Sequence, residues 1–247
     1  MPGKLTLKQD LNNCMKICAI SDTHNQHRSI KLPEADILIH AGDFTNRGKI
    51  EECASFLNWF GEQTQYKARI CIAGNHDFLS QKDPNLFKSL IPSNVTYLRD
   101  SGIEIEGLKI WGTPWQPFFY DWAWNGLEKR ENVGLAYEGG PGNGSEADKD
   151  HPWLKDVYAQ IPDDTNVLIC HGPPRLGTLD VVHMHRKLGS VDLYNRIKEL
   201  GDLKAGVYGH MHSGYGIHEF MLAQHCNAAL CDEFNKLVKE PIVVEIE

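Results

Sequence analysis

The sequence has no long apolar run and no cluster of basic residues. None of its apolar stretches approaches the roughly 18 residues that a membrane-spanning helix requires. Residues 1–20 carry charges throughout and lack the apolar stretch of a signal peptide. From these absences we expect no membrane association and a location in the cytoplasm.

Charge and cysteine content narrow the class of protein further. Acidic residues outnumber basic ones, 33 to 25, which gives a formal net charge of −8. Such a surface repels a phosphate backbone, so a long nucleic acid is not an expected partner. Three of the seven cysteines, Cys18, Cys71 and Cys170, lie inside apolar runs, where a reduced cysteine behaves as a small core residue. A reducing compartment is expected, and the sequence leaves a homo-oligomer open.

Short apolar runs that end in glycine or a polar cluster recur along the chain. They cover residues 15–21, 35–42, 68–74, 166–172 and 205–210. Their length, branched residues and abrupt ends predict buried strands. A hairpin is predicted within residues 95–115, with its turn at Glu106-Gly107, and a last strand at residues 241–247.

Segments with helical periodicity lie between these runs, at residues 49–63, 83–91, 151–161 and 190–201. Ser190 is a predicted N-cap and Gly201 a predicted stop, and the two short helices each have a proline near the first turn. Strands that alternate with helices and then form hairpins predict an α/β sandwich with mixed sheets. Residues 1–247 are assigned to one domain, with a surface loop at residues 134–150.

At or just after the end of each of the five apolar runs lie side chains with nitrogen or oxygen donors. They are Asp22 and His24, Asp43, the Asn75-His76-Asp77 group, His171, and His210 and His212. Each piece alone has an ordinary explanation, such as a turn or a polar residue at a strand end. Five pieces at strand ends, all with the same type of donor, favour one site, because ligands bind at the carboxyl edge of α/β sheets.

The donor set has a chemical logic of its own. Seven of these residues offer imidazole, carboxylate or amide ligands and none offers a thiolate: Asp22, His24, Asp43, Asn75, His171, His210 and His212. Seven ligands are too many for one tetrahedral zinc but suit two adjacent ions that share a carboxylate. Two metals roughly 3.5–4 Å apart are a known arrangement for phosphoryl transfer.

The ordered series D-x-H, G-D, G-N-H-D, H and G-H-x-H, which spans residues 22–212, resembles the calcineurin-like metallophosphoesterase superfamily. The stretches HAGDFTNRG, GTPWQPFF, HGPPRLG and GHMHSGYG are similar to the metallophosphoesterase-domain-containing family, near the class III cyclic nucleotide phosphodiesterases. The resemblance implies a four-layer αββα sandwich with two mixed sheets. Residues 127–150 are longer than the family's usual link, and nothing is transferred to them.

The resemblance also implies a role for each site residue. It assigns Asp22, His24 and His212 to one metal, Asn75, His171 and His210 to the other, and Asp43 to both. A water or hydroxide shared by the ions would attack phosphorus in line. His76 would lie over the phosphate as a catalytic group, and Asp77 would orient its ring.

The resulting hypothesis is a dinuclear metal-dependent phosphoesterase, with a phosphodiesterase on a small soluble substrate such as a nucleotide favoured. Two divalent ions are expected as cofactors, with Mn²⁺, Fe or Zn²⁺ preferred over Mg²⁺ by the four histidines. A phosphomonoesterase, and a metal-binding scaffold with little turnover, are the alternatives. The sequence assigns no residue to substrate binding.

A few further residues keep two interpretations. The first His-Met-His copy, with His183 and His185, is either an exposed loop or a segment that overhangs the site. His40 is interpreted as a hydrogen-bonded interior residue. Six aromatic residues could stack a substrate or pack in a core or a dimer: Trp115, Phe118, Phe119, Tyr120, Trp122 and Trp124. Three basic residues contact substrate or are simply solvated: Arg175, Arg186 and Lys187.

Overall fold

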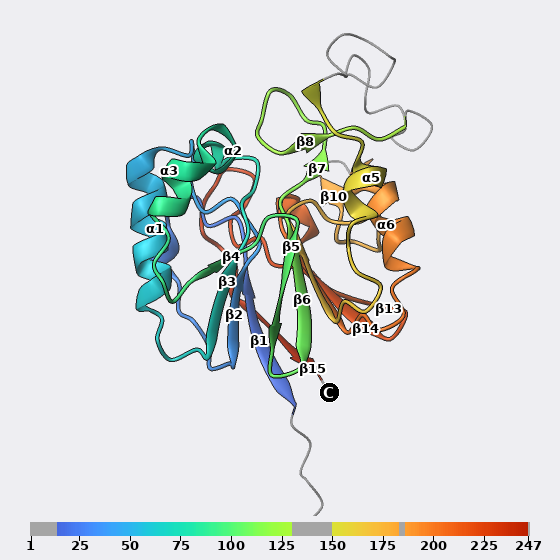
Figure 1. The fold of residues 1–247 in the computed structure, drawn as a ribbon, viewed down its shortest axis with the longest axis horizontal. Helices are drawn as coiled ribbons and strands as arrows, with labels where there is room; N and C mark the ends of the chain where they lie inside the picture. Colours follow the sequence, from blue (N-terminus) through green and yellow to red (C-terminus); the bar gives the residue numbers. More distant parts are fainter. Residues whose placement is uncertain (1–13, 130–149, 183–185, 247) are drawn as a thin grey trace, which may run out of the picture.

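Two mixed β-sheets pack face to face, and helices cover their outer faces (Figure 1). The computed structural model describes residues 14–129, 150–182 and 186–246. The expected α/β sandwich is therefore confirmed. Most of the predicted 134–150 loop, together with His183 and His185, lies outside the described residues.

The first sheet has the strand order β15-β1-β2-β3-β4. Strands β1 to β4 run parallel, and β15 pairs antiparallel with β1 at the edge. The strands are β1 (Met15–Ile20), β2 (Ile37–His40), β3 (Ala68–Cys71), β4 (Thr96–Tyr97) and β15 (Ile242–Ile246). Because these strands are parallel, the loops after β1, β2 and β3 lie together at the carboxyl end of the sheet.

The second sheet has the order β13-β14-β12-β9-β6-β5. Its centre is parallel, and antiparallel hairpins close both edges. The strands are β5 (Ser101–Ile105), β6 (Leu108–Thr113), β9 (Val167–Cys170), β12 (Ala205–Tyr208), β13 (Gly216–Phe220) and β14 (Ala223–Asn227). The predicted hairpin is β5–β6, whose turn residues Glu106 and Gly107 both have positive φ.

Both faces of the central strands are buried, which explains their continuous apolar sequences. In β1, Ile17 and Ala19 belong to the core between the sheets, whereas Cys18 and Ile20 pack under the helices. In β9, Ile169 faces the same inter-sheet core. Alternation of side chains across each strand thus builds an α/β/β/α arrangement of four layers. All seven cysteines are free.

The helices divide between the two outer faces (Figure 1). They are α1 (Ile50–Glu62), α2 (Phe78–Lys82) and α3 (Pro84–Ser89) over the first sheet, and α5 (Leu154–Tyr158) and α6 (Val191–Ile197) over the second. Ser190 caps α6 as predicted, because its side chain accepts the Leu193 N–H at 2.9 Å. The predicted stop at Gly201 is wrong, since α6 ends at Ile197.

Several short elements complete the described chain. They are η1 (His27–Ser29), β7 (Gln116–Pro117), β8 (Asn125–Gly126), β10 (Val181–Val182), β11 (Arg186–Lys187) and η5 (His212–Gly214). Pro152 precedes α5 instead of opening it, because Trp153 is the N-cap. Within the described ranges no helix is long and apolar enough to cross a bilayer.

Candidate metal centre

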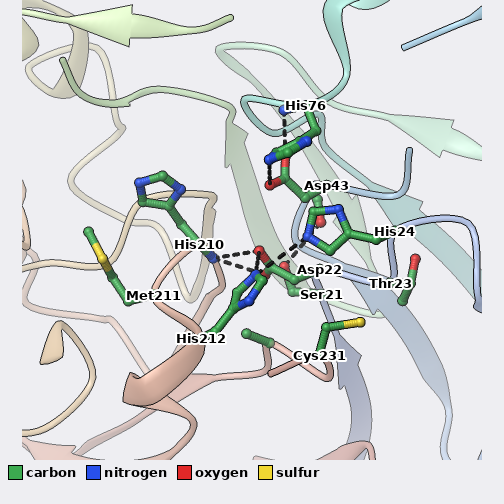
Figure 2. Close-up of polar contacts among 12 residues, drawn as sticks. Ser21, Asp22, Thr23, His24, Asp43, His76, His210, Met211, His212 and Cys231 are labelled. Atoms are coloured by element: carbon green, nitrogen blue, oxygen red, sulfur yellow. Dashed lines mark hydrogen bonds and ion pairs between the residues drawn. The ribbon is translucent and has the colours of Figure 1, made fainter. Parts of the chain in front are cut away.

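The predicted donor residues converge where the carboxyl edges of the two sheets meet. Figure 2 shows Asp22 between His210 and His212, with His24 and the Asp43–His76 pair beside them. Two groups of three residues have ligand atoms within 4.8 Å of one another: Asp22, His24 and His212, and Asp43, His171 and His210. A third group joins His24, Asp43 and His76. Residues after β1, β2 and β3 therefore meet residues after β9 and β12.

The rings of His24 and His212 point their Nε2 atoms at each other across 3.4 Å. Both rings use Nδ1 elsewhere: His24 bonds the Thr45 carbonyl at 3.2 Å and His212 the Asp232 carbonyl at 2.7 Å. A carbonyl only accepts, so each Nδ1 carries a proton, and each Nε2 is left to bind a metal ion or a second proton. The Asp22 Oδ1 lies 3.2 Å from the same His212 Nε2. Two ring nitrogens and a carboxylate oxygen that face one another fit a metal ion, and without an ion a proton on His212 Nε2 would pair with Asp22.

His171 is also oriented by a backbone carbonyl at Nδ1, with its Nε2 toward the centre. Its Nδ1 bonds the Ala41 carbonyl at 2.8 Å, and its Nε2 lies 3.0 Å from Asn75 Oδ1 and 3.4 Å from Asp43 Oδ1. His210 adds a fourth donor, with its ring centroid 5.1 Å from that of His171. Imidazole nitrogen, carboxylate and amide oxygen are ligands that suit zinc, manganese or iron. The residues present therefore fit two ions.

The backbone around these groups is strained. Asp22, His24, Asp43 and His210 all have positive φ, between 41° and 67°. This left-handed conformation costs side-chain-bearing residues of order 1–3 kcal/mol and gathers at functional sites. The strain turns the four side chains toward the shared centre.

Glycine is required at two points where backbone approaches a carboxylate. A Cβ on Gly74 would lie 2.3 Å from Asp43 Oδ1, and one on Gly209 would lie 2.2 Å from Asp22 Oδ2. Neither distance is compatible with a side chain. The chain thus passes close behind both carboxylates and leaves their free sides toward the centre.

The two carboxylates are fully buried and ionised. Burial alone would raise the pKa of Asp22, but the hydrogen bond and charge of His212 outweigh it and hold the pKa below its usual value. For Asp43, burial is outweighed by the charges of His171 and His76, so its pKa lies well below the ordinary range. Two buried negative charges side by side need compensation by cations.

The shared environment shifts the pKa values of the histidines in different directions. Burial favours the neutral ring of His171, but the charge and hydrogen bond of Asp43 prevail and raise its pKa to about 9. Burial and then the charge of His171 lower the pKa of His210 to about 3. Burial also lowers the pKa of His24. A proton on His171 Nε2 would compensate Asp43 where no metal ion is bound.

His76 stands at the rim of the centre. Its Nδ1 bonds the Asn46 carbonyl at 2.8 Å, and its Nε2 lies 3.9 Å from Asp43 Oδ2. Its backbone N–H donates to Asp43 Oδ1 at 2.7 Å. The ring of Trp122 lies against it, with centroids 4.2 Å apart. His76 is 19% exposed, so its Nε2 is accessible to a molecule that enters from solvent.

Asp77 does not orient the His76 ring as expected. Its carboxylate instead accepts the N–H groups of Asp43, Thr45 and Gly74 at 2.8–3.0 Å, and the Thr45 hydroxyl at 2.8 Å. Burial and the charge of Asp43 raise the pKa of Asp77 to about 8, and the hydrogen bonds from Gly74 and Thr45 oppose them. Asp77 fixes the backbone that carries Asp43, and the Asn46 carbonyl orients His76.

The other residues named from the sequence lie in the core, beside the centre or away from both cavities. His40 is fully buried and bonds the Thr23 hydroxyl at 3.0 Å, as predicted. Of the six aromatic residues, Trp124 is a core residue, whereas Phe119 and Trp122 border the centre. The three basic residues Arg175, Arg186 and Lys187 line neither cavity beside the centre.

Two cavities open beside the centre, and His76 lines both. One of about 600 Å³ is lined by His24, Asn25, Gln26, Asn46, Arg47, His76 and Asn235. The other, of about 180 Å³, is lined by Asp43, Asn75, His76, Phe119, Trp122, Val182, His210, Met211, His212 and Glu233. A molecule bound over the metal ligands therefore has two openings of different size and chemistry.

Several supporting groups have no signal in the sequence. The carbonyls of Thr45, Ala41 and Asp232 orient three of the histidines. Lys239 donates to the carbonyl of His212, which fastens the segment after β14 to the centre. Every residue has a carbonyl, so these contacts are identified only in the folded chain.

Comparisons with known proteins identify the family and the fold of the chain. Residues 15–214 match the profile of the calcineurin-like phosphoesterase family. Human metallophosphoesterase domain-containing protein 1 is 31% identical over 254 residues, which cover 94% of this chain and 71% of that protein. A UPF0046 protein of Caenorhabditis elegans is 33% identical over 94% of this chain and 75% of its own length. A solved structure with 14% identity has a TM-score of 0.59, over 95% of this chain and 100% of that one, and shares the fold.

Proposed function

The chain belongs to the calcineurin-like phosphoesterase family, and from that premise we propose that it is a dinuclear metal-dependent phosphodiesterase that acts on a small phosphate ester such as a nucleotide. The observation that carries the proposal is the pair of Nε2 atoms of His24 and His212, 3.4 Å apart, with Asp22 Oδ1 beside them. Two imidazole nitrogens and a carboxylate aimed at one point suit a metal ion there, which supports the proposal.

The ligand assignment follows from the two groups. Asp22, His24 and His212 would hold one ion, and Asn75, His171 and His210 the other, with Asp43 between them. The ions would supply positive charge to phosphate oxygens and a nucleophile at neutral pH. Mn²⁺, Fe or Zn²⁺ suit a set with four imidazoles better than Mg²⁺ does.

His76 is the proposed acid–base residue. Hydrolysis bonds a water oxygen to phosphorus, breaks one P–O ester bond and needs a proton on the departing oxygen. With Nδ1–H donated to the Asn46 carbonyl, a proton on Nε2 of His76 is the one that the ring can transfer. Asp77 would act by holding the Asp43 backbone in position.

Charge favours a diester over a monoester. A monoester carries nearly two negative charges at neutral pH, whereas a diester carries one. Glu233 lines the small cavity, no Lys or Arg is among its lining residues in the described chain, and the net charge is −8. The second negative charge of a monoester would therefore be repelled by Glu233 in the small cavity.

The test uses metal-free protein reloaded with Mn²⁺. Hydrolysis of bis(p-nitrophenyl) phosphate is expected to depend on the metal and to exceed that of p-nitrophenyl phosphate. Asn75→Ala and His212→Ala remove proposed ligands and should lower the diester rate about tenfold or more. Asn58→Ala, on the exposed face of α1, and His218→Ala, on β13, are matched controls that should keep wild-type rates.

Two other outcomes would change the assignment. A higher monoester rate, with the same dependence on Asn75 and His212, would make the protein a phosphomonoesterase. If protein shown to hold two ions per chain hydrolysed neither ester, the enzymatic proposal would be wrong and a metal-binding scaffold would replace it.

A further inference from the structure

We propose that the substrate is an unsymmetrical phosphodiester whose two halves lie in different cavities. Its larger half bears hydroxyl or amide groups, as a nucleoside does, and lies in the cavity of about 600 Å³. Its smaller half is flat and apolar and lies in the cavity of about 180 Å³. This inference rests on the proposed phosphodiesterase function and assigns side chains to each half of the substrate.

The position of His76 connects the two cavities. Its ring lines both, and its Nε2 lies 3.9 Å from Asp43 Oδ2 at the metal ligands. His24 lies on the large cavity and His212 on the small one. A phosphate held over the ligands at this point would therefore send one ester group into each cavity.

The large cavity is polar, and no acidic side chain is among its lining residues in the described chain. Four of its seven lining residues are amides, and Arg47 adds the single permanent positive charge among them. Asn25 and Gln26 use their amide groups on Glu52 and on the backbone of Asn235. By contrast, the side-chain amides of Asn46 and Asn235 form no hydrogen bond with other described residues. These two amides are available to a ligand.

Amide side chains recognise particular ligand groups. Each offers two N–H donors and one oxygen acceptor, which pair with hydroxyl groups and with the edges of amide-like rings. A cavity of about 600 Å³ is within the range for small-molecule ligands, roughly 300–1,000 Å³. Its chemistry and size fit a nucleoside or a sugar.

The small cavity combines candidate metal ligands with an aromatic surface. Four of its ten lining residues are candidate metal ligands, which would hold the phosphate: Asp43, Asn75, His210 and His212. Phe119, Trp122 and Met211 add an aromatic and apolar surface for an ester group, and Glu233 would repel a second anion. At about 180 Å³ it is smaller than ordinary ligand pockets, which begin at roughly 300 Å³. It admits a single ring or a short alkyl group.

Trp122 is fixed as the wall of the small cavity. His76 lies 4.2 Å from its ring centroid, Phe78 lies 5.7 Å away, and the Arg47 guanidinium lies over it at 5.6 Å. Contacts on several sides limit the rotation of the indole. A flat ester group therefore meets a preformed aromatic surface beside His76.

Two diesters with the same p-nitrophenyl leaving group separate the halves. In bis(p-nitrophenyl) phosphate both halves are aryl, whereas the p-nitrophenyl ester of thymidine 5′-phosphate has one polar half. Asn46→Ala and Asn235→Gly should lower kcat/KM for the thymidine ester about tenfold and for the bis-aryl ester less than about twofold. Glycine is chosen at 235 because Asn235 has a φ of 55°.

The complementary variant is Trp122→Ala, which should lower kcat/KM for both esters to a similar degree. Phe234→Ala is the matched control for the 235 position: Phe234 is 83% exposed and lines neither cavity. This control should leave both rates unchanged.

The inference is overturned if Asn46→Ala and Asn235→Gly lower the two rates equally or lower neither. Those results differ from failure of the proposed function, in which the wild-type metal-loaded protein would hydrolyse neither diester.

Discussion

The Asp77 carboxylate accepts the backbone N–H of Asp43 at 2.9 Å, which joins the loop after β3 to the loop after β2. In Asp77→Asn, one oxygen becomes an NH₂ group that faces N–H donors. We expect a loss of about 3 kcal/mol in the free energy of unfolding, because buried N–H donors lose an acceptor and face an NH₂ group instead. Urea unfolding followed by circular dichroism measures it.

Asp83→Asn is the matched control for this change. The Asp83 side chain caps α3 through the Leu86 N–H at an exposed position, and asparagine caps helices equally well. Its unfolding free energy should stay within about 0.5 kcal/mol of wild type. Equal losses in both variants would contradict the role assigned to Asp77.

Gly209→Ala should disrupt the centre. The new Cβ would lie 2.0 Å from Ser21 Oγ and 2.2 Å from Asp22 Oδ2, so the Asp22 loop must move. We expect a loss of about 2 kcal/mol or more in stability and of most metal binding. Metal content after gel filtration and thermal unfolding measure both effects.

Gly201→Ala tests whether any added methyl group has this effect. A Cβ at Gly201 meets nothing within 4 Å, so stability and metal content should be close to wild type. Full metal content in Gly209→Ala would show that the approach to Asp22 is not required.

Metal removal should destabilise the protein. Two ions that bind only the folded chain stabilise it by RT ln(1 + [L]/Kd) per site, about 2.7 kcal/mol at a hundredfold excess over Kd. Chelation should therefore lower Tm by several degrees, roughly 5 °C or more. Reloading at pH 7.5 should release protons, because the pKa of His171 is raised to about 9 before an ion binds. An unchanged Tm and no proton release would argue against binding at these residues.

His225 makes stability depend on pH. The ring is fully buried in β14, and burial lowers its pKa from 6.5 to about 4. The unfolded chain binds the proton first, so stability is complete above pH 6.5 and falls between pH 6.5 and 4. His225→Gln should reduce this fall by on the order of 2–3 kcal/mol.

Urea titrations of wild type and His225→Gln across pH 4–8 measure the difference. Loss of the hydrogen bond between the Tyr208 hydroxyl and His225 Nδ1 lowers the unfolding free energy of the variant at every pH. The two curves should therefore run parallel above pH 6.5 and converge below it. Parallel curves throughout would show that His225 does not titrate with folding.

The sequence predicts the parts of this molecule that local patterns encode. Residues 15–21 and 166–172 are apolar on both faces, and they form the central strands β1 and β9. Parallel strands carry the residues that follow them to one edge, which is why Asp22 and His171 meet although they are far apart in the chain. The resemblance to the metallophosphoesterase-domain-containing family is confirmed by the human and nematode relatives.

The rest depends on contacts that no pattern encodes. The role of Asp77 was predicted wrongly because its nearest neighbour in sequence, His76, is oriented by the Asn46 carbonyl instead. The amides of Asn46 and Asn235 line one cavity only because the chain after β14 returns to the centre. The metal identity, the single-domain assignment and the cytoplasmic location stay predictions.

The candidate ligands are divided between the two sheets, and this division has a mechanical consequence. Asp22 follows β1 and His212 follows β12, and the two side chains face each other although their positions differ by 190 in the chain. An ion bound by both would cross-link the two halves of the sandwich, much as a disulfide closes a long loop. The two sheets could then separate at this end only if the coordination bonds broke. The site at which substrate enters would therefore also be the site that holds the two sheets together.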